Sequence, residues 1–288
     1  MAGSTLVATA WTSAGNTSPV RTPPVSPVPI DERVAAVAEA GYCGMGLIAA
    51  DLAVIRDDIG FAGLRDLLAD HGLTHIEIEL LERWWVPRDE PTNTYAVREL
   101  LFDAADVLSP AFIKIGSENG PATRDPLALV EPLRELADQA AARGTRIAIE
   151  TMPFSVIATV PMGAEIVSAA AHSAAGLLVD AWHVFRAGTT LDELGNALAG
   201  DMIFGVELDD AAPAVVGTLF EDTVDNRLLC GEGCFDLPGL VELLRTKGFR
   251  GPWGVEILST SFRALPVHDA LKLAAKSARP LLCDAESV

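Results

Sequence analysis

The sequence predicts an α/β protein of the (β/α)8 TIM-barrel class. Short apolar runs alternate eight times with segments that have the spacing of amphipathic helices. Most of these runs are apolar throughout and rich in β-branched residues, which is typical of parallel strands buried on both faces. Glycine stands at several helix ends, for example at Gly72 and Gly144. No GxGxxG motif follows the first run, so an open dinucleotide-binding sheet is the less favoured arrangement.

The eight strands are expected where the apolar runs are bounded by polar residues, Gly or Pro. They are predicted at residues 6–9, 45–49, 75–80, 112–116, 147–150, 177–180, 203–208 and 253–257. Between the runs, apolar residues recur every three or four positions, which predicts helices that cover the sheet. These helices are predicted at residues 30–40, 61–71, 94–108, 126–143, 163–172, 191–199, 237–247 and 266–278.

Residues 11–29 are rich in Pro, Ser and Thr and are predicted to form a long loop after the first strand. Such a loop at the top of a barrel is either a lid over the site or a mobile connection, and the sequence favours neither interpretation. Because α/β barrels often exceed the usual domain size, we expect residues 1–288 to form a single domain.

Composition and charge narrow the classes of partner. Half of the residues are hydrophobic, which suits a large buried core. The net charge of −19 opposes binding to nucleic acid or to an anionic membrane. The first residues lack the basic region of a signal peptide and no run is apolar enough to span a bilayer, so we expect a cytoplasmic protein. The four cysteines have no CxxC spacing and are expected as reduced thiols. A homo-oligomer stays an open expectation.

Four of the apolar runs end in a carboxylate, and this is the main indication of function. The acids are Glu150, Asp180, Glu207 and Glu256. Because the strands of a parallel barrel all finish at one end, these side chains are expected to meet there, where they would repel one another unless they shared a cation. Oxygen ligands suit Mg, Mn and similar divalent ions. The alternative is that each acid caps the next helix or pairs with a Lys or Arg, which explains one acid better than four. Glu79 could also reach the site but is left out of the predicted metal set.

Several other side chains are expected near the same end. His183 alone among the histidines follows a strand end, where it could bind substrate or move a proton, or else hold a loop. Arg227 precedes a glycine-rich turn and is either a substrate ligand or a solvated loop residue. Trp11 and Trp182 follow strand ends, where indole rings suit the apolar face of a sugar, although core packing is the alternative for each. Lys114 lies inside a strand and points either toward the acids or outward.

The motifs that carry these residues resemble one known family. They are IAIE ending at Glu150, LLVDAWH with Asp180 and His183, FGVELDD with Glu207, and the stretch from RLLCGEG at Arg227 to GFRGPWGVE at Glu256. In this order they resemble the xylose isomerase-like barrels, which include sugar isomerases and epimerases, inosose dehydratases and related enzymes. The resemblance implies that Glu150, Asp180 and Glu256 bind a divalent metal and that His183 and Arg227 contact substrate. The chain departs from the family at Glu207, where His or Gln is usual.

The resemblance implies an isomerase or epimerase of a small keto sugar or sugar phosphate, with carbohydrate as its small-molecule partner. In that hypothesis Glu150 and Glu256 are catalytic, and proton transfer passes through a metal-stabilised enediolate with one divalent ion, which is Mn, Mg, Co or Zn. The first alternative is a lyase, a metal-dependent dehydratase of the inosose or dehydroshikimate type. The second is a non-catalytic metal or sugar binding protein, which the unusual Glu207 motivates.

Overall fold

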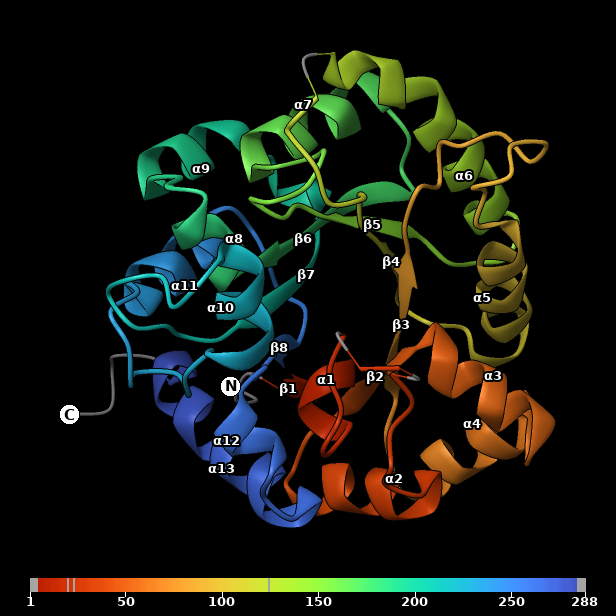
Figure 1. Cartoon of the computed structure of the whole chain (residues 1–288), viewed down its shortest axis with the longest axis vertical. Helices are drawn as coiled ribbons and strands as arrows, with labels where there is room; N and C mark the ends of the chain where they lie inside the picture. Colours follow the sequence, from red (N-terminus) through yellow and green to blue (C-terminus); the bar gives the residue numbers. More distant parts are fainter. Residues whose placement is uncertain (1–4, 20, 23, 124, 284–288) are drawn as a thin grey trace.

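The computed structural model describes residues 5–19, 21–22, 24–123 and 125–283. Eight parallel strands form a closed barrel in chain order, and the helices form a ring around it (Figure 1). The strands are β1 (Leu6–Ala8), β2 (Gly44–Ile48), β3 (His75–Leu81), β4 (Phe112–Ile115), β5 (Ile147–Glu150), β6 (Ala175–Asp180), β7 (Ile203–Leu208) and β8 (Trp253–Val255). The predicted (β/α)8 class is therefore confirmed, and each expected strand is present with shifts of a few residues at its ends.

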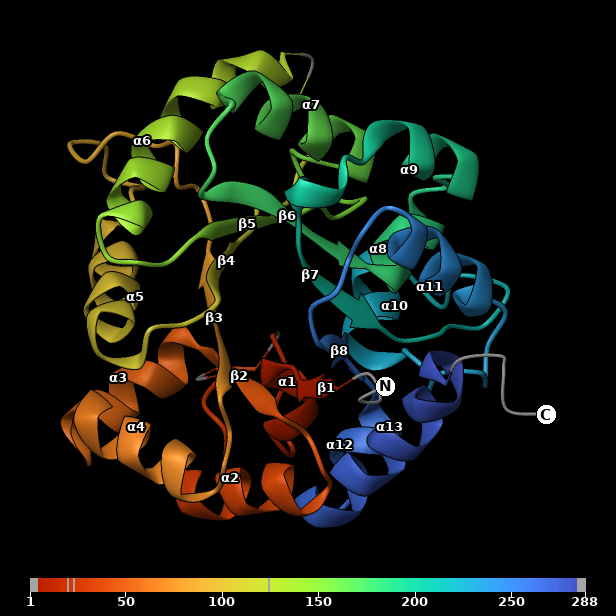
Figure 2. The ribbon, with the colours of Figure 1, turned by 180° about the vertical axis from the view of Figure 1, so that it is seen from behind.

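The eight expected helices are also present. They are α2 (Ile30–Glu39), α4 (Gly60–Asp70), α5 (Tyr95–Leu108), α6 (Val130–Ala141), α7 (Val160–Ala170), α9 (Leu191–Ala197), α11 (Leu237–Thr246) and α13 (Val267–Leu282). The last helix, α13, lies beside α2, so the end of the described chain closes the ring against its beginning (Figures 1 and 2). Within the described ranges, no helix has the combination of length and apolarity that crossing a bilayer requires.

The structure adds short helices that the sequence did not predict. They are α1 (Ala10–Ser13), α3 (Ala49–Asp57), α8 (Ala181–Arg186), α10 (Leu219–Asp225) and α12 (Thr260–Arg263), with the 3-10 turn η2 (Gly200–Met202). The helix predicted at residues 126–143 begins with a 3-10 turn, η1 (Pro126–Leu129), and continues as α6. Most are too short to show a helical period. Helices α3 and α8 also begin directly at the ends of β2 and β6, without any turn residue to mark a boundary.

The predicted loop over residues 11–29 needs a correction, because its first residues belong to α1. The rest is irregular, and residues 20 and 23 lie outside the described ranges. Ser26 fixes the end of this segment: its backbone N–H donates to Oδ1 of Asp51 at 2.8 Å, and its hydroxyl donates to the carbonyl of Ala14 at 2.8 Å. This end of the loop is thus tied to α3.

A small apolar cluster fills the lower interior of the barrel and sets the position of the site above it. The cluster consists of Phe112, Ala148, Leu178 and Phe204, and it is separate from the core between strands and helices. Because residues two apart on a strand face the same side, Lys114, Glu150 and Asp180 point into the barrel one layer higher than their cluster neighbours. Alternation along the strands therefore places an apolar floor under a charged layer.

Gly205 completes this floor. A Cβ atom at Gly205 would lie 2.7 Å from Cζ of Phe112, so only glycine leaves room for the phenyl ring. Two residues further along β7, Glu207 points into the charged layer, and its register places it beside Asp180 on β6.

Candidate active site

The structure brings the four predicted metal ligands together at the carboxyl ends of β5 to β8. Glu150, Asp180, Glu207 and Glu256 are all buried, and each offers one oxygen such that the four atoms lie within 4.8 Å of one another. Asp180 and Glu207 lie on neighbouring strands in register, whereas Glu256 directly follows β8. The four acids thus form one cluster.

Lys114 points toward these acids. Its Nζ lies 2.6 Å from Oε2 of Glu79 and 2.7 Å from Oε1 of Glu207. The distances to Oε1 of Glu256 and Oε2 of Glu150 are 3.7 and 3.9 Å. Of the two orientations open for Lys114, the structure has the inward one, and it also brings Glu79 into the charged layer.

Arg227 forms a second cationic centre on the other side of the acids. Its Nη1 donates to Oδ2 of Asp180 at 2.7 Å and to Asp209, and lies 3.2 Å from Oε2 of Glu256. Its Nη2 donates to the hydroxyl of Thr223 at 2.8 Å. Arg227 is buried and borders the cavity, so it is held by several partners and is not a solvated loop residue.

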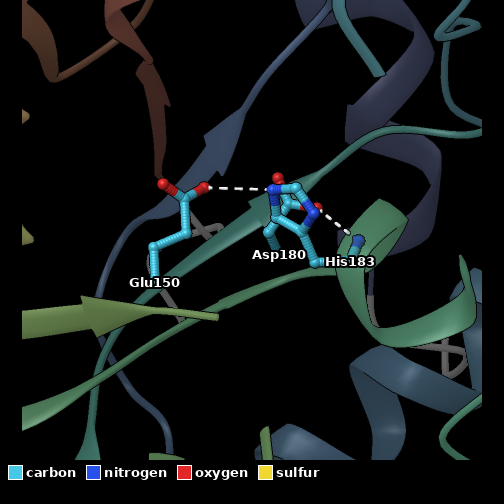
Figure 3. A group of neighbouring side chains, drawn as sticks. All are labelled: Glu150, Asp180 and His183. Atoms are coloured by element: carbon cyan, nitrogen blue, oxygen red, sulfur yellow. Dashed lines mark hydrogen bonds and ion pairs between the residues drawn. The ribbon is translucent and has the colours of Figure 1, made fainter. Parts of the chain in front are cut away.

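His183 joins the acids through both backbone and side chain (Figure 3). Its backbone N–H donates to Oδ1 of Asp180 at 2.9 Å, which makes Asp180 the N-cap of α8. Its Nε2 lies 3.5 Å from Oε1 of Glu150. The other ring nitrogen, Nδ1, is buried and has no hydrogen-bond partner among the described residues. His183 also lines the cavity, so its side chain is within reach of a molecule bound there, as the prediction requires.

The two tryptophans of the prediction have different surroundings. Trp11 borders the cavity. Trp182 is fully buried, does not line the cavity, and donates from Nε1 to Oδ2 of Asp222 at 3.1 Å. Its ring lies under the guanidinium of Arg227, with 5.6 Å between Cζ and the ring centroid. Trp182 therefore supports Arg227, and its predicted contact with substrate is corrected to this packing role.

A cavity of about 630 Å³ opens above the acids. That volume is within the range of small-molecule sites. One wall of the cavity, formed by residues of β2, β3, α3 and α5, is apolar. It consists of Ile48, Ala49, Ala50, Ala53, Leu80, Val97 and Leu100. Phe154 and Phe220 contribute aromatic rings above β5 and β7, and the Phe154 ring lies 6.1 Å from that of His183. The cavity thus has a charged floor and a largely apolar wall.

The pKa shifts show that the cluster carries more negative charge than its cations offset. Burial, and then the charge of Glu256, raise the pKa of Glu207 well above its usual range. Burial also raises the pKa of Glu256. The pKa of Glu79 rises to about 7, because the effect of burial exceeds the opposing effect of Lys114. For Glu150, burial is outweighed by Lys114 and His183, and the pKa falls to about 2. The protein therefore holds protons in this cluster that a divalent cation could replace.

The donor atoms fit such a cation. Oε2 of Glu207 and Oε1 of Glu256 are buried and accept no hydrogen bond from the described residues. Unpaired buried oxygen atoms are costly, and a set of carboxylates that converges within 4.8 Å is the ligand type that hard divalent ions prefer. The ion would be held by Glu150, Asp180, Glu207 and Glu256.

Sequence reasoning missed three residues that contact this cluster or line the cavity. Asp209 lies two residues beyond Glu207, so strand alternation was a usable signal for it. Thr223 lies on α10, whose seven residues gave no clear helical period. Phe154 lies in the irregular segment after β5, for which the sequence gave no signal.

The fold and the site define a (β/α)8 barrel with a buried carboxylate cluster, suited to a divalent ion, at the carboxyl ends of its strands. The chain belongs to the xylose isomerase-like TIM barrel family, whose sequence model matches residues 34–281. This confirms the resemblance found in the motifs.

Two curated relatives are enzymes of different classes. The 3-dehydroshikimate dehydratase of Pseudomonas aeruginosa is 30% identical over 243 residues, which cover 83% of this chain and 38% of the dehydratase. The inosose isomerase of Bacillus subtilis is 29% identical over 150 residues, which cover 51% of this chain and 52% of the isomerase. The chain thus matches only about two fifths to one half of the length of these relatives.

Solved structures share the fold at lower identity. The IOLI protein with a bound zinc atom has a TM-score of 0.79 and 21% identity, and the match covers 99% of this chain and 100% of that one. A D-allulose 3-epimerase from Methylomonas sp. has a TM-score of 0.69 and 18% identity, and the match covers 97% of this chain and 96% of that one.

Proposed function

We propose that the chain is a divalent-metal-dependent isomerase or epimerase of a small keto sugar or related polyhydroxy ketone. The observation that carries the proposal is the convergence of four carboxylates, Glu150, Asp180, Glu207 and Glu256, two of which, Glu150 and Glu256, line a cavity large enough for such a substrate. The inosose isomerase relative and the epimerase with the same fold support this class of reaction.

The ion would be one divalent cation held by the four carboxylates. Mg and Mn suit an all-oxygen site, and the zinc atom of the IOLI protein keeps Zn, as well as Co, among the candidates. When bound, the cation would polarise the substrate carbonyl and offset the negative charge that develops beside it.

Residues of the chain would transfer the proton and position the substrate. Glu150 and Glu256 border the cavity, one at the end of β5 and the other directly after β8, so they would face the substrate from two sides and exchange a proton at the carbon next to the carbonyl. His183, whose Nε2 is next to Glu150, would orient a substrate hydroxyl. Arg227 would border the same oxygen atoms, and Trp11 would cover an apolar face of the substrate while the cavity wall excludes water.

The charges around the cavity favour an uncharged substrate. Among the described lining residues, Lys114 and Arg227 are the lysine and arginine side chains, and both already contact several carboxylates. A substrate carboxylate or phosphate would therefore find no side-chain cation free to bind it. This supports a keto sugar or cyclic polyol ketone over a charged analogue.

Hydrogen exchange tests the proposal. The metal-loaded protein is incubated in heavy water with keto sugars and cyclic polyol ketones, and deuterium incorporation is measured by mass spectrometry. Exchange should occur in the wild type and be lost in Glu150→Gln and Glu256→Gln, while Glu165→Gln, at an exposed position on α7, keeps it. Exchange that persists in both site variants would refute these roles, and metal binding without exchange on any substrate would favour a non-catalytic binding protein.

A dehydratase is the second candidate, because the relative matched over 83% of the chain is a 3-dehydroshikimate dehydratase. Both reactions begin with removal of a proton beside a carbonyl, and a lyase then expels a β-hydroxyl group as water. An ultraviolet-absorbing enone product would identify the lyase, whereas an isomer or epimer without new absorbance would identify the isomerase.

A further inference from the structure

Lys114 lies among four glutamates of the charged layer. The side chain is only 2% exposed, and its Nζ contacts Glu79 and Glu207 at 2.6 and 2.7 Å. A lysine buried to this degree remains charged only where carboxylates offset the cost of removing it from water. The positive charge is therefore a fixed part of the cluster.

The two carboxylate oxygens of Glu207 have different surroundings. Oε1 accepts from Lys114 at 2.7 Å, whereas Oε2 is buried and has no partner among the described residues. Glu207 is also one of the four residues whose ligand atoms converge, together with Asp180 on the neighbouring strand. Lys114 thus binds one oxygen and leaves the other for the shared centre.

Lys114 offsets part of the negative charge of Glu207, because its ammonium group also contacts Glu79. Without Lys114, four carboxylates would surround a divalent ion with a charge of −4, and Arg227 would offset part of it from the side of Asp180 and Glu256. With Lys114, β7 offers an oxygen ligand that adds less net charge. An ion that is less fully neutralised remains a stronger Lewis acid.

We propose that Lys114 is a positioning residue of the metal site, which offsets the charge of Glu207 and holds that side chain with one oxygen directed to the ion. The inference rests on the proposed metal-dependent function. It predicts that Lys114 and Glu207 act as a unit, so that removal of one residue changes metal affinity more than removal of both.

Comparison of the two single variants with the double variant tests whether the two charges offset each other. Mn²⁺ is titrated calorimetrically into metal-free wild type, Lys114→Met, Glu207→Gln and the double variant, at about pH 8.5, which lies above the raised pKa of Glu79, about 7. Glu207→Gln leaves the charge of Lys114 uncompensated beside the ion, so the affinity should fall at least roughly tenfold. Lys114→Met removes a repulsive charge, so the affinity should rise by a similar factor, and the double variant should return to within roughly threefold of the wild type.

Two further variants separate charge from packing. Lys114→Arg keeps the positive charge and should keep the affinity closer to that of the wild type than Lys114→Met does. Glu77→Gln replaces another buried glutamate of β3, one that contacts His75 instead of Lys114, and should leave metal affinity unchanged. Near-ultraviolet circular dichroism shows whether each variant is folded.

The outcomes are distinguishable. A Lys114→Met variant whose affinity does not rise, or a double variant that binds as weakly as Glu207→Gln alone, would overturn the role of Lys114 while leaving the metal site intact. If Lys114→Met does not fold, an unchanged affinity in Glu207→Gln alone overturns the inference. A wild type that binds none of Mn²⁺, Mg²⁺, Co²⁺ or Zn²⁺ would instead overturn the proposed function itself.

Discussion

Arg227 donates a hydrogen bond from Nη1 to Oδ2 of Asp180 at 2.7 Å, although the two residues are 47 positions apart in the sequence. The same Asp180 accepts from the backbone of His183 through its other oxygen. One carboxylate therefore joins the segment before β8 to the N-terminus of α8, and the loss of Arg227 should disturb both.

Replacement of Arg227 by Met should destabilise the protein. The change leaves Asp180, Asp209 and Glu256 buried without their cationic partner, and breaking a buried ion pair in this way costs ~3–5 kcal/mol. Urea unfolding of the metal-free protein measures the loss. Arg250→Met removes an exposed arginine whose hydrogen bonds go to backbone carbonyls, and should change the free energy of unfolding far less. A similar loss in both variants would contradict the assigned role.

The metal-free protein should become less stable as the pH rises toward neutrality. In the folded state burial raises the pKa of Glu79 from 4.5 to about 7, so between these values the folded chain binds more proton than the unfolded chain. The free energy of unfolding then falls with rising pH, by at most roughly 1.4 kcal/mol per pH unit for one group. Urea unfolding in the presence of a chelator, between about pH 5 and 8, measures the slope.

Glu79→Gln provides the control for that pH dependence. The variant cannot lose a proton at position 79, so its stability should decline less steeply through the same window. Burial also raises the pKa values of Glu207 and Asp209 well above their usual range, and their contribution should persist in the variant. Identical slopes in the wild type and in Glu79→Gln would show that Glu79 does not titrate near neutrality.

Gly205→Ala should destabilise the barrel by overpacking its apolar floor. The new Cβ would lie 2.7 Å from Cζ of Phe112, and strain of this kind typically costs ~1–3 kcal/mol. Thermal unfolding measures the effect. Gly120→Ala is the matched control, because its nearest neighbour, Cγ2 of Val156, would lie 4.0 Å away. The shorter side chain in Phe112→Leu should restore part of the stability of Gly205→Ala, and no restoration would place the strain elsewhere.

Thr218→Ala should weaken the site as well as the fold. Thr218 and Glu221 form a capping box at the start of α10, the helix that presents Thr223 to Arg227. Loss of such a cap costs ~1 kcal/mol. Thr190→Ala removes the same capping box from α9 and should cost a similar amount of stability. Calorimetric metal titration should detect weaker binding only in Thr218→Ala, and equal affinities would separate α10 from the site.

The strand ends and their acids were predictable because their signals are local. Glu150 and Asp180 each close an apolar run, and the closed parallel topology then dictates that they meet. Glu79 was weighed and left out, because its strand alternates Ile with Glu and the sequence could not tell how far the side chain reaches.

Other parts depended on distances that a single sequence does not contain. Lys114 had two permitted orientations, and only the apolar floor beneath it shows which one the chain adopts. Trp182 follows a strand end as a substrate-binding residue would, but α8 turns its ring away from the cavity toward Asp222. Helix α8 itself was missed because six residues directly after a strand give too short a pattern.

The apolar floor under the carboxylates closes the barrel below the charged layer. Phe112 and Leu178 of this floor are both essentially fully buried, so among the described residues they offer water, hydrogen isotopes and small ions no polar route from below. In a pocket closed on that side, a hydrogen taken from a substrate remains near the atom it left until solvent enters from the mouth. Direct return of the original hydrogen would then compete with washout of the isotopic label, and narrowing the mouth would shift that balance.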